Sequence, residues 1–102
     1  MILDKILEAQ KKAEEIKSRL DTIIVRSEVE GGKIRVTATG NKILTAISID
    51  PQFLITSDSE QLEELLLTAI NKVLQQAEQV SQSEMQAVTK EMMGNLGNLF
   101  GK

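Results

Sequence analysis

A single long helical pattern in the second half of the chain constrains the fold more than any other feature. From about Ser59 to Met93 there is no glycine or proline, and apolar residues recur at spacings of three and four. Ser57 and Glu60 have the S-x-x-E spacing of a capping box, which predicts that the helix starts near Ser59. The apolar positions are Leu62, Leu65, Leu66, Ala69, Ile70, Val73, Leu74, Ala77, Val80, Ala87, Val88 and Met92.

The length of this helix implies a partner. At 1.5 Å per residue, a helix of about 35 residues is about 50 Å long. A compact domain of this size has a diameter of roughly 30 Å, so the rest of a 102-residue chain cannot cover the helix. A second copy of the same chain is the simplest cover for the apolar surface left open, and we predict a homodimer.

A shorter amphipathic helix is predicted over residues 2–22. Apolar side chains follow the same three-four spacing there, without an interrupting glycine or proline. On its polar side, Glu8 precedes Lys12 and Glu15 precedes Arg19 by one turn, the favourable order for ion pairs within a helix. The first helix is therefore expected to present a charged, solvated face.

Three strands are predicted between the two helices, because apolar and polar residues alternate over the segments 23–30, 33–39 and 43–50. Gly31-Gly32 is a two-residue hairpin signal, and Gly40-Asn41 repeats the turn chemistry before the third strand. The side chains expected to share the apolar side of each strand are Ile23, Val25 and Val29, then Ile34, Val36 and Ala38, then Ile43, Thr45, Ile47 and Ile49.

Asp50-Pro51 ends the third strand, since proline cannot donate to a strand ladder. Residues 52–56 are predicted to form a connector whose Phe53 and Leu54 pack onto the core. The fold is thus predicted as a single α+β domain over residues 1–93, with a three-stranded antiparallel meander between helices of about 20 and about 35 residues, in the order α-β-β-β-α. Residues 94–102, rich in glycine and asparagine, predict a flexible C-terminal tail.

The residue types that the chain lacks exclude most enzyme mechanisms. It contains no Cys, His, Trp or Tyr, which excludes a disulfide framework, a zinc finger, a thiol nucleophile and a histidine base. Adjacent acids on a helix, such as Glu63 and Glu64, diverge by about 100° and cannot converge on one substrate. We expect no catalytic residue, metal, cofactor or small-molecule substrate. Apolar runs of at most three residues predict neither a signal peptide nor a membrane span, and we expect a cytoplasmic protein.

Positive charge is concentrated early in the chain. Residues 1–42 carry nine bases and seven acids, whereas residues 43–102 carry three bases and eight acids. A net charge of −3 and a pI near 5.0 argue against a protein that coats DNA, for which a basic domain is typical. Any contact with nucleic acid is therefore expected from a local patch.

Two clusters of bases could supply such a patch. Lys5, Lys12 and Arg19 recur every seven residues, so they predict a basic stripe along the first helix that drifts only about 20° per step. The alternative is a solvated face that neighbouring glutamates neutralise. The second cluster, on the predicted sheet, is Arg26, Lys33 and Arg35, which form a patch or else block pairing at a strand edge. Without Trp or Tyr to stack on bases, duplex backbone is the expected nucleic-acid target.

Short strings with a family pattern follow the order of the predicted elements: Gln10–Glu15, Gly31–Thr37, Gly40, Ile47–Pro51, Leu62–Leu66 and Ala69–Lys72. In this order and spacing they resemble the YbaB/EbfC family of bacterial nucleoid-associated proteins, over about residues 5–92. The resemblance implies an intertwined dimer whose helices project like the arms of a tweezer, and sequence-tolerant binding to duplex DNA in the nucleoid. It places the DNA-binding residues on the first helix, at Lys5, Lys11, Lys12, Lys17 and Arg19.

Two functions follow from these patterns. The first is a nucleoid-associated protein that binds duplex DNA as a homodimer, mainly through phosphate contacts from the first helix, in an architectural or regulatory role. The alternative is a dimeric protein–protein interaction module that does not bind DNA, for which the acidic second half and the adaptable side chains of Met85, Met92 and Met93 would be suited. Salt-sensitive binding to duplex DNA distinguishes the first function from the second.

Overall fold

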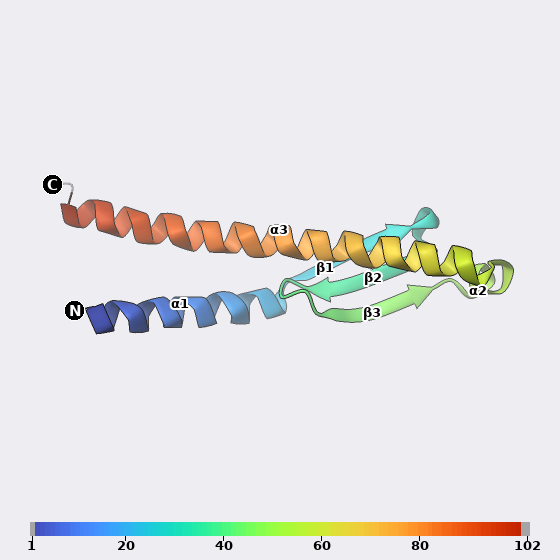
Figure 1. Cartoon of the computed structure of the whole chain (residues 1–102), viewed down its shortest axis with the longest axis horizontal. Helices are drawn as coiled ribbons and strands as arrows, with labels where there is room; N and C mark the ends of the chain where they lie inside the picture. The colour runs from blue at the N-terminus through green and yellow to red at the C-terminus, as the bar shows by residue number, and fades with distance from the viewer. Residues whose placement is uncertain (1, 101–102) are drawn as a thin grey trace.

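The computed structural model describes residues 2–100, with side-chain positions through residue 94. It confirms the predicted α-β-β-β-α order, with two short elements added (Figure 1). The elements are α1 (Ile2–Thr22), β1 (Ile24–Val29), the 3₁₀ turn η1 (Glu30–Gly32), β2 (Ile34–Thr39), β3 (Leu44–Ile49), α2 (Pro51–Thr56) and α3 (Ser59–Phe100).

The strands form one antiparallel sheet in the order β1-β2-β3, and α3 packs across β1 and β2 on one face. Ile34, Val36 and Ala38 of β2 are fully buried beneath α3, as their alternation predicts. They pack against Ala69 and Val73 of the helix in the hydrophobic core. Burial of side chains this size contributes most of the driving force for folding.

Ser27 is the one polar side chain among the buried residues that the structure describes. It occupies the inward position between Val25 and Val29, where the sequence pattern had no apolar residue. Its hydroxyl donates to the backbone carbonyl of Ala69 at 2.6 Å, which satisfies the buried group and ties β1 to α3.

The third strand departs from its predicted pattern. Thr45 was expected to share a side with Ile47, but its hydroxyl lies 2.7 Å from that of Thr37, on the opposite face of the sheet. A register shift where Thr37 and Ala38 of β2 pair with β3 accounts for this correction, because a bulge turns one residue out of the alternation. The core-side Ile47 is 49% exposed, since α3 covers the other two strands and leaves β3 open.

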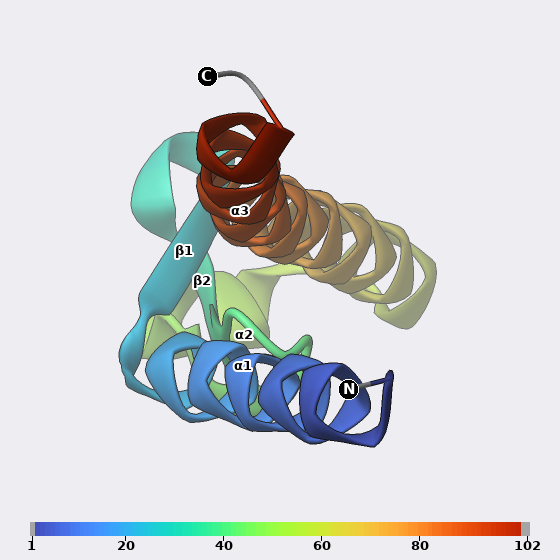
Figure 2. The same ribbon diagram turned by 90° about the vertical axis from the view of Figure 1, so that its left-hand side faces the viewer.

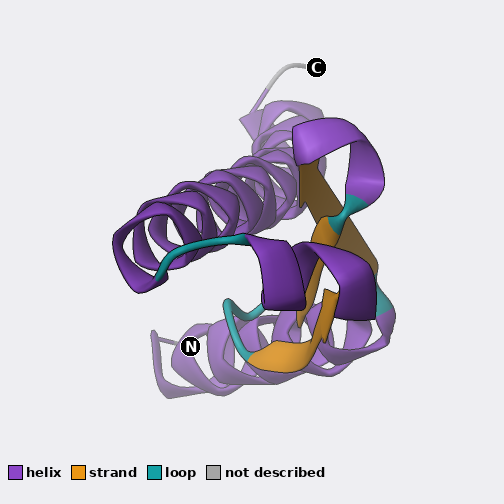
Figure 3. Cartoon of the chain, turned by 90° about the vertical axis from the view of Figure 1, so that its right-hand side faces the viewer, coloured by secondary structure: helices purple, strands orange, loops and turns teal. Residues whose placement is uncertain are grey.

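The segment predicted as a connector is the helix α2. Asp50 caps its N-terminus, accepting from the backbone N–H of Phe53 at 3.0 Å, and Pro51 occupies the first helical turn. Phe53 is buried, as predicted, whereas Leu54 is 50% exposed and does not pack onto the core. Figure 3 shows α2 at the end of the molecule where α3 begins.

The first turn is wider than the predicted two-residue Gly31-Gly32 hairpin. Glu30, Gly31 and Gly32 all have positive φ, at 54°, 63° and 89°. Glycine adopts this left-handed region at little cost. Glu30 is one of the non-glycine residues with positive φ in the described chain. The backbone N–H of Lys33 closes the turn on the carbonyl of Glu30 at 3.2 Å.

Helix α3 starts at Ser59 as predicted, but with a different cap. Asp58 accepts from the backbone N–H of Gln61 at 2.7 Å, whereas the hydroxyl of Ser57 turns back to the carbonyl of Phe53 at 2.6 Å. The predicted Ser57–Glu60 capping box is therefore wrong. Asp58 sits at the N-cap and performs the same task one residue later.

The helix also extends past its predicted end. It has 42 residues and reaches Phe100, so the boundary expected at residue 93 is corrected, and residues 94–100 of the predicted tail are helical. Residues 101–102 of that tail lie outside the described residues. At 1.5 Å per residue the helix is about 63 Å long, which accounts for a molecule measuring 67 × 22 × 18 Å.

Two regions can be defined along this axis. The body comprises the sheet, α2 and residues 59–80 of α3. The arm comprises α1 and residues 81–100 of α3, which extend from the body toward the same end (Figures 1 and 2). The radius of gyration is 19.7 Å, compared with about 13 Å for a compact domain of this size.

Candidate nucleic-acid interface

The five bases that the sequence assigns to DNA contact all lie on α1, in the arm. Lys5, Lys11, Lys17 and Arg19 are exposed, and Lys12 is half-buried. Helix α1 carries five bases and five acids in total, so its charge is locally mixed rather than uniformly positive. The fields of neighbouring opposite charges on α1 largely cancel at a distance, and salt screens exposed charges beyond a Debye length of about 10 Å. An anion would therefore be attracted by individual side chains at short range.

The base of α1 is fastened to the body. Leu20 is buried, and its backbone carbonyl accepts from the N–H of Gly40 at 3.0 Å. A Cβ added to Gly40 would lie 2.8 Å from Leu20 Cδ2, so this close approach requires glycine. The amide of Asn41 donates to the carbonyl of Lys17 at 2.9 Å and also to Asp21. These contacts set the direction in which the candidate bases project.

The predicted basic stripe faces α3. Lys12 Nζ lies 3.6 Å from Glu91 Oε1. Arg19 donates to Glu84 Oε2 at 2.8 Å. Among the described residues, both cations thus pair across the arm instead of with Glu8 and Glu15 on their own helix, which corrects the ion pairs expected from one-turn spacing. Lys5, Lys12 and Arg19 do lie in line on α1, but Lys12 and Arg19 are each paired with a carboxylate of α3.

The acidic partners continue the face of α3 that packs on the sheet. Ala77, Glu84 and Glu91 are spaced by seven residues, which returns to nearly the same side of a helix. Ala77 is fully buried against the body, whereas Glu84 and Glu91 lie beyond the sheet. The face is apolar where its neighbour is the sheet and acidic where its neighbour is α1.

Lys5, Lys11 and Lys17 make no ion pair with any residue that the structure describes. Lys11 lines a cavity of about 340 Å³ in the arm, with Glu8, Lys12, Glu15 and Met92. The free ammonium groups lie on different sides of α1, because their sequence separations are not multiples of a helical turn. They are the side chains of α1 most available to an external anion.

The second predicted cluster is less uniform. Arg35 Nε lies 3.1 Å from Glu28 Oε2 across the strand pair. Arg26 and Arg35 line a shallow cavity of about 300 Å³ on the open face of the sheet. Lys33 instead places its ammonium 5.5 Å from the centre of the Phe53 ring, a cation–π contact. One base of this cluster is thus paired to Glu28 and another contacts the Phe53 ring, so these three bases do not act as one uniform anion site.

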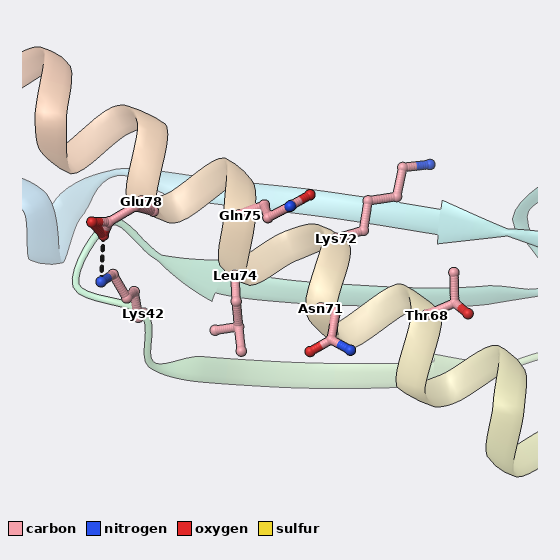
Figure 4. A pocket seen from close by; sticks show the side chains of 7 residues that line it. All are labelled: Lys42, Thr68, Asn71, Lys72, Leu74, Gln75 and Glu78. Carbon is pink, nitrogen blue, oxygen red and sulfur yellow. Dashed lines mark ion pairs between the residues drawn. The ribbon is translucent and has the colours of Figure 1, made fainter.

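A broad concavity lies on the flank of α3 beside the turn between β2 and β3 (Figure 4). It measures about 810 Å³, and Asn71, Leu74 and Glu78 extend into it from α3. Lys42, from the turn, pairs with Glu78. Lys42 and Glu78 neutralise each other, whereas Lys72, which also lines the concavity, contacts the backbone carbonyl of Glu28.

An apolar row runs along the same side of α3. Leu67, Leu74, Met85 and Met92 are separated by seven and eleven residues, which places them in line on a helix. Leu67 is 61%, Met85 55% and Met92 42% exposed. The sequence predicted that the chain could not cover its long helix, and these exposures agree.

The described residues include neither a metal-ligand cluster nor a membrane-spanning helix. No cluster of three His, Cys, Asp or Glu side chains there is placed to hold a metal ion. None of the described helices combines the length and apolar character needed to cross a membrane.

Comparison with known proteins gives a consistent result. The model of the YbaB/EbfC DNA-binding family matches residues 1–92. A nucleoid-associated protein of Flavobacterium johnsoniae is 36% identical over 102 residues, covering 97% of this chain and 94% of that protein. One from Ruminiclostridium cellulolyticum is 36% identical over 92 residues, covering 90% and 76%. An uncharacterized Helicobacter pylori protein of known crystal structure shares the fold, with a TM-score of 0.65 at 23% identity over 81% of this chain and 93% of that one.

Proposed function

The chain belongs to the YbaB/EbfC DNA-binding family, and from this membership we propose that it is a nucleoid-associated protein that binds duplex DNA as a homodimer. It acts in the cytoplasm, in the nucleoid, in an architectural or regulatory role and without catalysing a reaction. The observation that carries the proposal is the placement of five basic side chains on a projecting helix, in a chain of this family.

DNA contact is assigned to α1. Lys5, Lys11 and Lys17 are exposed, so each is available to phosphate on its own side of α1. Lys12 and Arg19 join them when their pairs with α3 open, because exposed ion pairs contribute at most about 1 kcal/mol each. Lysine recognises phosphate as a point charge and reads no base edge, so these contacts favour duplex DNA of any sequence.

Dimerisation is assigned to the uncovered apolar surface. Along the row on α3, Leu67, Met85 and Met92 are 61%, 55% and 42% exposed, and the open strand β3 leaves Ile47 49% exposed. Covering such a row removes apolar area from water, at about 25 cal/mol per Å². A second copy presents the same row, which suits an isologous interface and doubles the number of α1 helices available to one duplex.

A fluorescence-anisotropy titration of a labelled duplex of about 30 base pairs tests the DNA contact. Wild type is expected to bind at low salt, with a log–log salt slope of about 0.9 per phosphate contact. The triple substitution Lys5→Ala, Lys11→Ala and Lys17→Ala should weaken binding and flatten the slope. The matched control removes the same charge from the body, through Lys33→Ala, Lys42→Ala and Lys72→Ala, and should retain the slope.

Absence of binding by wild type at low salt would reject the DNA-binding function. Equal losses in the two triple variants would instead reject α1 as the contact surface. Sedimentation velocity gives the oligomeric state independently: Leu67→Glu should shift the dimer toward monomer, because it places a charge within the apolar row at a residue that is 61% exposed. A monomeric wild type at micromolar concentration would reject the dimer.

The exposed methionines favour one alternative, a dimeric protein–protein interaction module that does not bind DNA. Met85 is 55% and Met93 64% exposed, and methionine adapts to varied apolar partners. For that function, neither lysine triple variant would weaken binding to the partner protein. The anisotropy of the labelled duplex would not change on addition of wild type at any salt concentration.

A further inference from the structure

Two ion pairs join α1 to α3 along the arm in a regular register. Lys12 pairs with Glu91, and Arg19 pairs with Glu84. The cations are seven residues apart on α1, and the carboxylates are seven residues apart on α3 in the reverse order. Both pairs therefore belong to one antiparallel row that runs along the facing sides of the two helices.

This row has an open end at Lys5. Seven residues further along this register the sequence has Asn98, which carries no charge, so the register supplies no carboxylate for Lys5. Of the three bases in the stripe, two have a carboxylate at their register position and one does not. The stripe thus offers a free cation at the tip of α1 and two occupied cations behind it.

Carboxylate and phosphate are alternative ligands for the same cations. Arginine and lysine donate charge-assisted hydrogen bonds to either anion, so a cation held by glutamate is not available to DNA until the pair opens. The side chains of Lys12 and Arg19 are 40% and 53% exposed, so an incoming phosphate can reach both. Exposed pairs of this kind are weak, which makes exchange of ligand feasible.

We propose that Glu84 and Glu91 compete with DNA phosphate for Arg19 and Lys12, and so set the affinity of the arm for DNA. This inference rests on the proposed DNA-binding function. The carboxylates of the two glutamates take the places that phosphates would occupy beside Lys12 and Arg19. They neutralise these two bases in the free protein and place negative charge beside an approaching duplex.

The test is the affinity of the double variant Glu84→Gln and Glu91→Gln for the same duplex, measured by anisotropy over a series of salt concentrations. Release of two exposed pairs should tighten binding by at least about threefold at low salt. The log–log salt slope should steepen by up to about 1.8, because two more cations contact phosphate. Glutamine keeps the length and helix propensity of glutamate, so the fold is expected to persist.

Two further variants separate competition from a general change of charge. Glu63→Gln with Glu64→Gln removes the same two charges from an exposed part of α3 in the body, and it should tighten binding less. Adding Lys12→Ala and Arg19→Ala to the Glu84/Glu91 variant should cancel the gain, since the released cations are then absent. A gain that survives these alanines, or an equal gain from the Glu63/Glu64 variant, overturns the competition.

The result also distinguishes this inference from the proposed function. If wild type binds the duplex and the Glu84/Glu91 variant binds no more tightly, the competition is rejected and DNA binding remains. If the variant binds where wild type does not, the proposed function of the wild type is rejected, and Glu84 and Glu91 are shown to block the DNA contact. If neither protein binds at low salt, the proposed function and the inference are both rejected.

Discussion

Helix α3 has two different neighbours, and the contrast between them separates stability from binding. In the body it packs on the sheet through fully buried Ala69, Val73 and Ala77. In the arm it meets α1 through two ion pairs whose side chains are 25–59% exposed. Buried apolar contacts are strong and insensitive to salt, whereas exposed ion pairs are weak and screened. The body therefore carries most of the stability, whereas the contacts between the two helices of the arm are weak and sensitive to salt.

The largest effect should come from a cavity in the body. Ile34→Ala removes a fully buried side chain from the core and should lower the free energy of unfolding by about 2–5 kcal/mol. Ile6→Ala on α1 is the comparison in the arm, where the side chain is 48% exposed, and it should cost less than about 1 kcal/mol. Denaturant unfolding monitored by circular dichroism measures both. Equal costs would contradict the division into body and arm.

The junction between the regions should show an intermediate effect. Gly40→Ala places a Cβ 2.8 Å from Leu20 Cδ2 and 3.0 Å from the Leu20 carbonyl oxygen. Helix α1 must shift to relieve this clash, and the free energy of unfolding should fall by about 1–3 kcal/mol. Gly94→Ala serves as the control, because no atom lies within 4 Å of the added Cβ and alanine favours helix. The two alanines should move the thermal midpoint in opposite directions.

A smaller loss is expected when the buried polar tie in the body is cut. Ser27→Ala removes the hydrogen bond to the carbonyl of Ala69 and should cost about 1 kcal/mol. Valine at this position provides a second measurement, since it adds apolar volume without a donor. Hydrogen exchange of the β1 amides should increase in the alanine variant. Unchanged stability in both variants would show that the hydroxyl is not needed.

The smallest effect on stability should come from the arm itself. Glu84→Gln removes one exposed ion pair and should change the free energy of unfolding by no more than about 0.5–1 kcal/mol. That change should vanish in about 1 M salt, where the Debye length falls to about 3 Å. Unfolding curves at low and high salt give this comparison. A salt-independent loss of several kcal/mol would place Glu84 among the structural residues of the body.

Strong periodicity predicted the large elements of this fold. The extent of α1 over residues 2–22 follows from three-four spacing, and the burial of Ile34, Val36 and Ala38 follows from alternation. The start of α3 at Ser59 was predicted from a capping box that does not form, so the right residue was found for the wrong reason. The helix α2 was missed because a segment of six residues is too short to show a helical period. The cap at Asp58 was missed because Ser57, beside it, fits the same motif.

The candidate site was less predictable, because its partners are distant in sequence. Seven-residue spacing along α1 predicted the stripe of Lys5, Lys12 and Arg19. The rule for ion pairs one turn apart, however, paired Lys12 with Glu8 and Arg19 with Glu15. The actual partner of Arg19 lies 65 residues away, and only the antiparallel packing of the two helices brings it close. The contact of these bases with DNA remains a proposal.

The fastening of α1 at Leu20 and Gly40 also makes the helix a lever. Its 21 residues extend about 30 Å from this pivot, so a rotation of about 10° moves the tip by about 5 Å. Successive phosphates on a DNA strand advance by about 3.4 Å along the axis. In the DNA-binding function proposed above, such a swing would carry Lys5 past more than one phosphate, and the tip would settle on the backbone without regard to the bases beneath it.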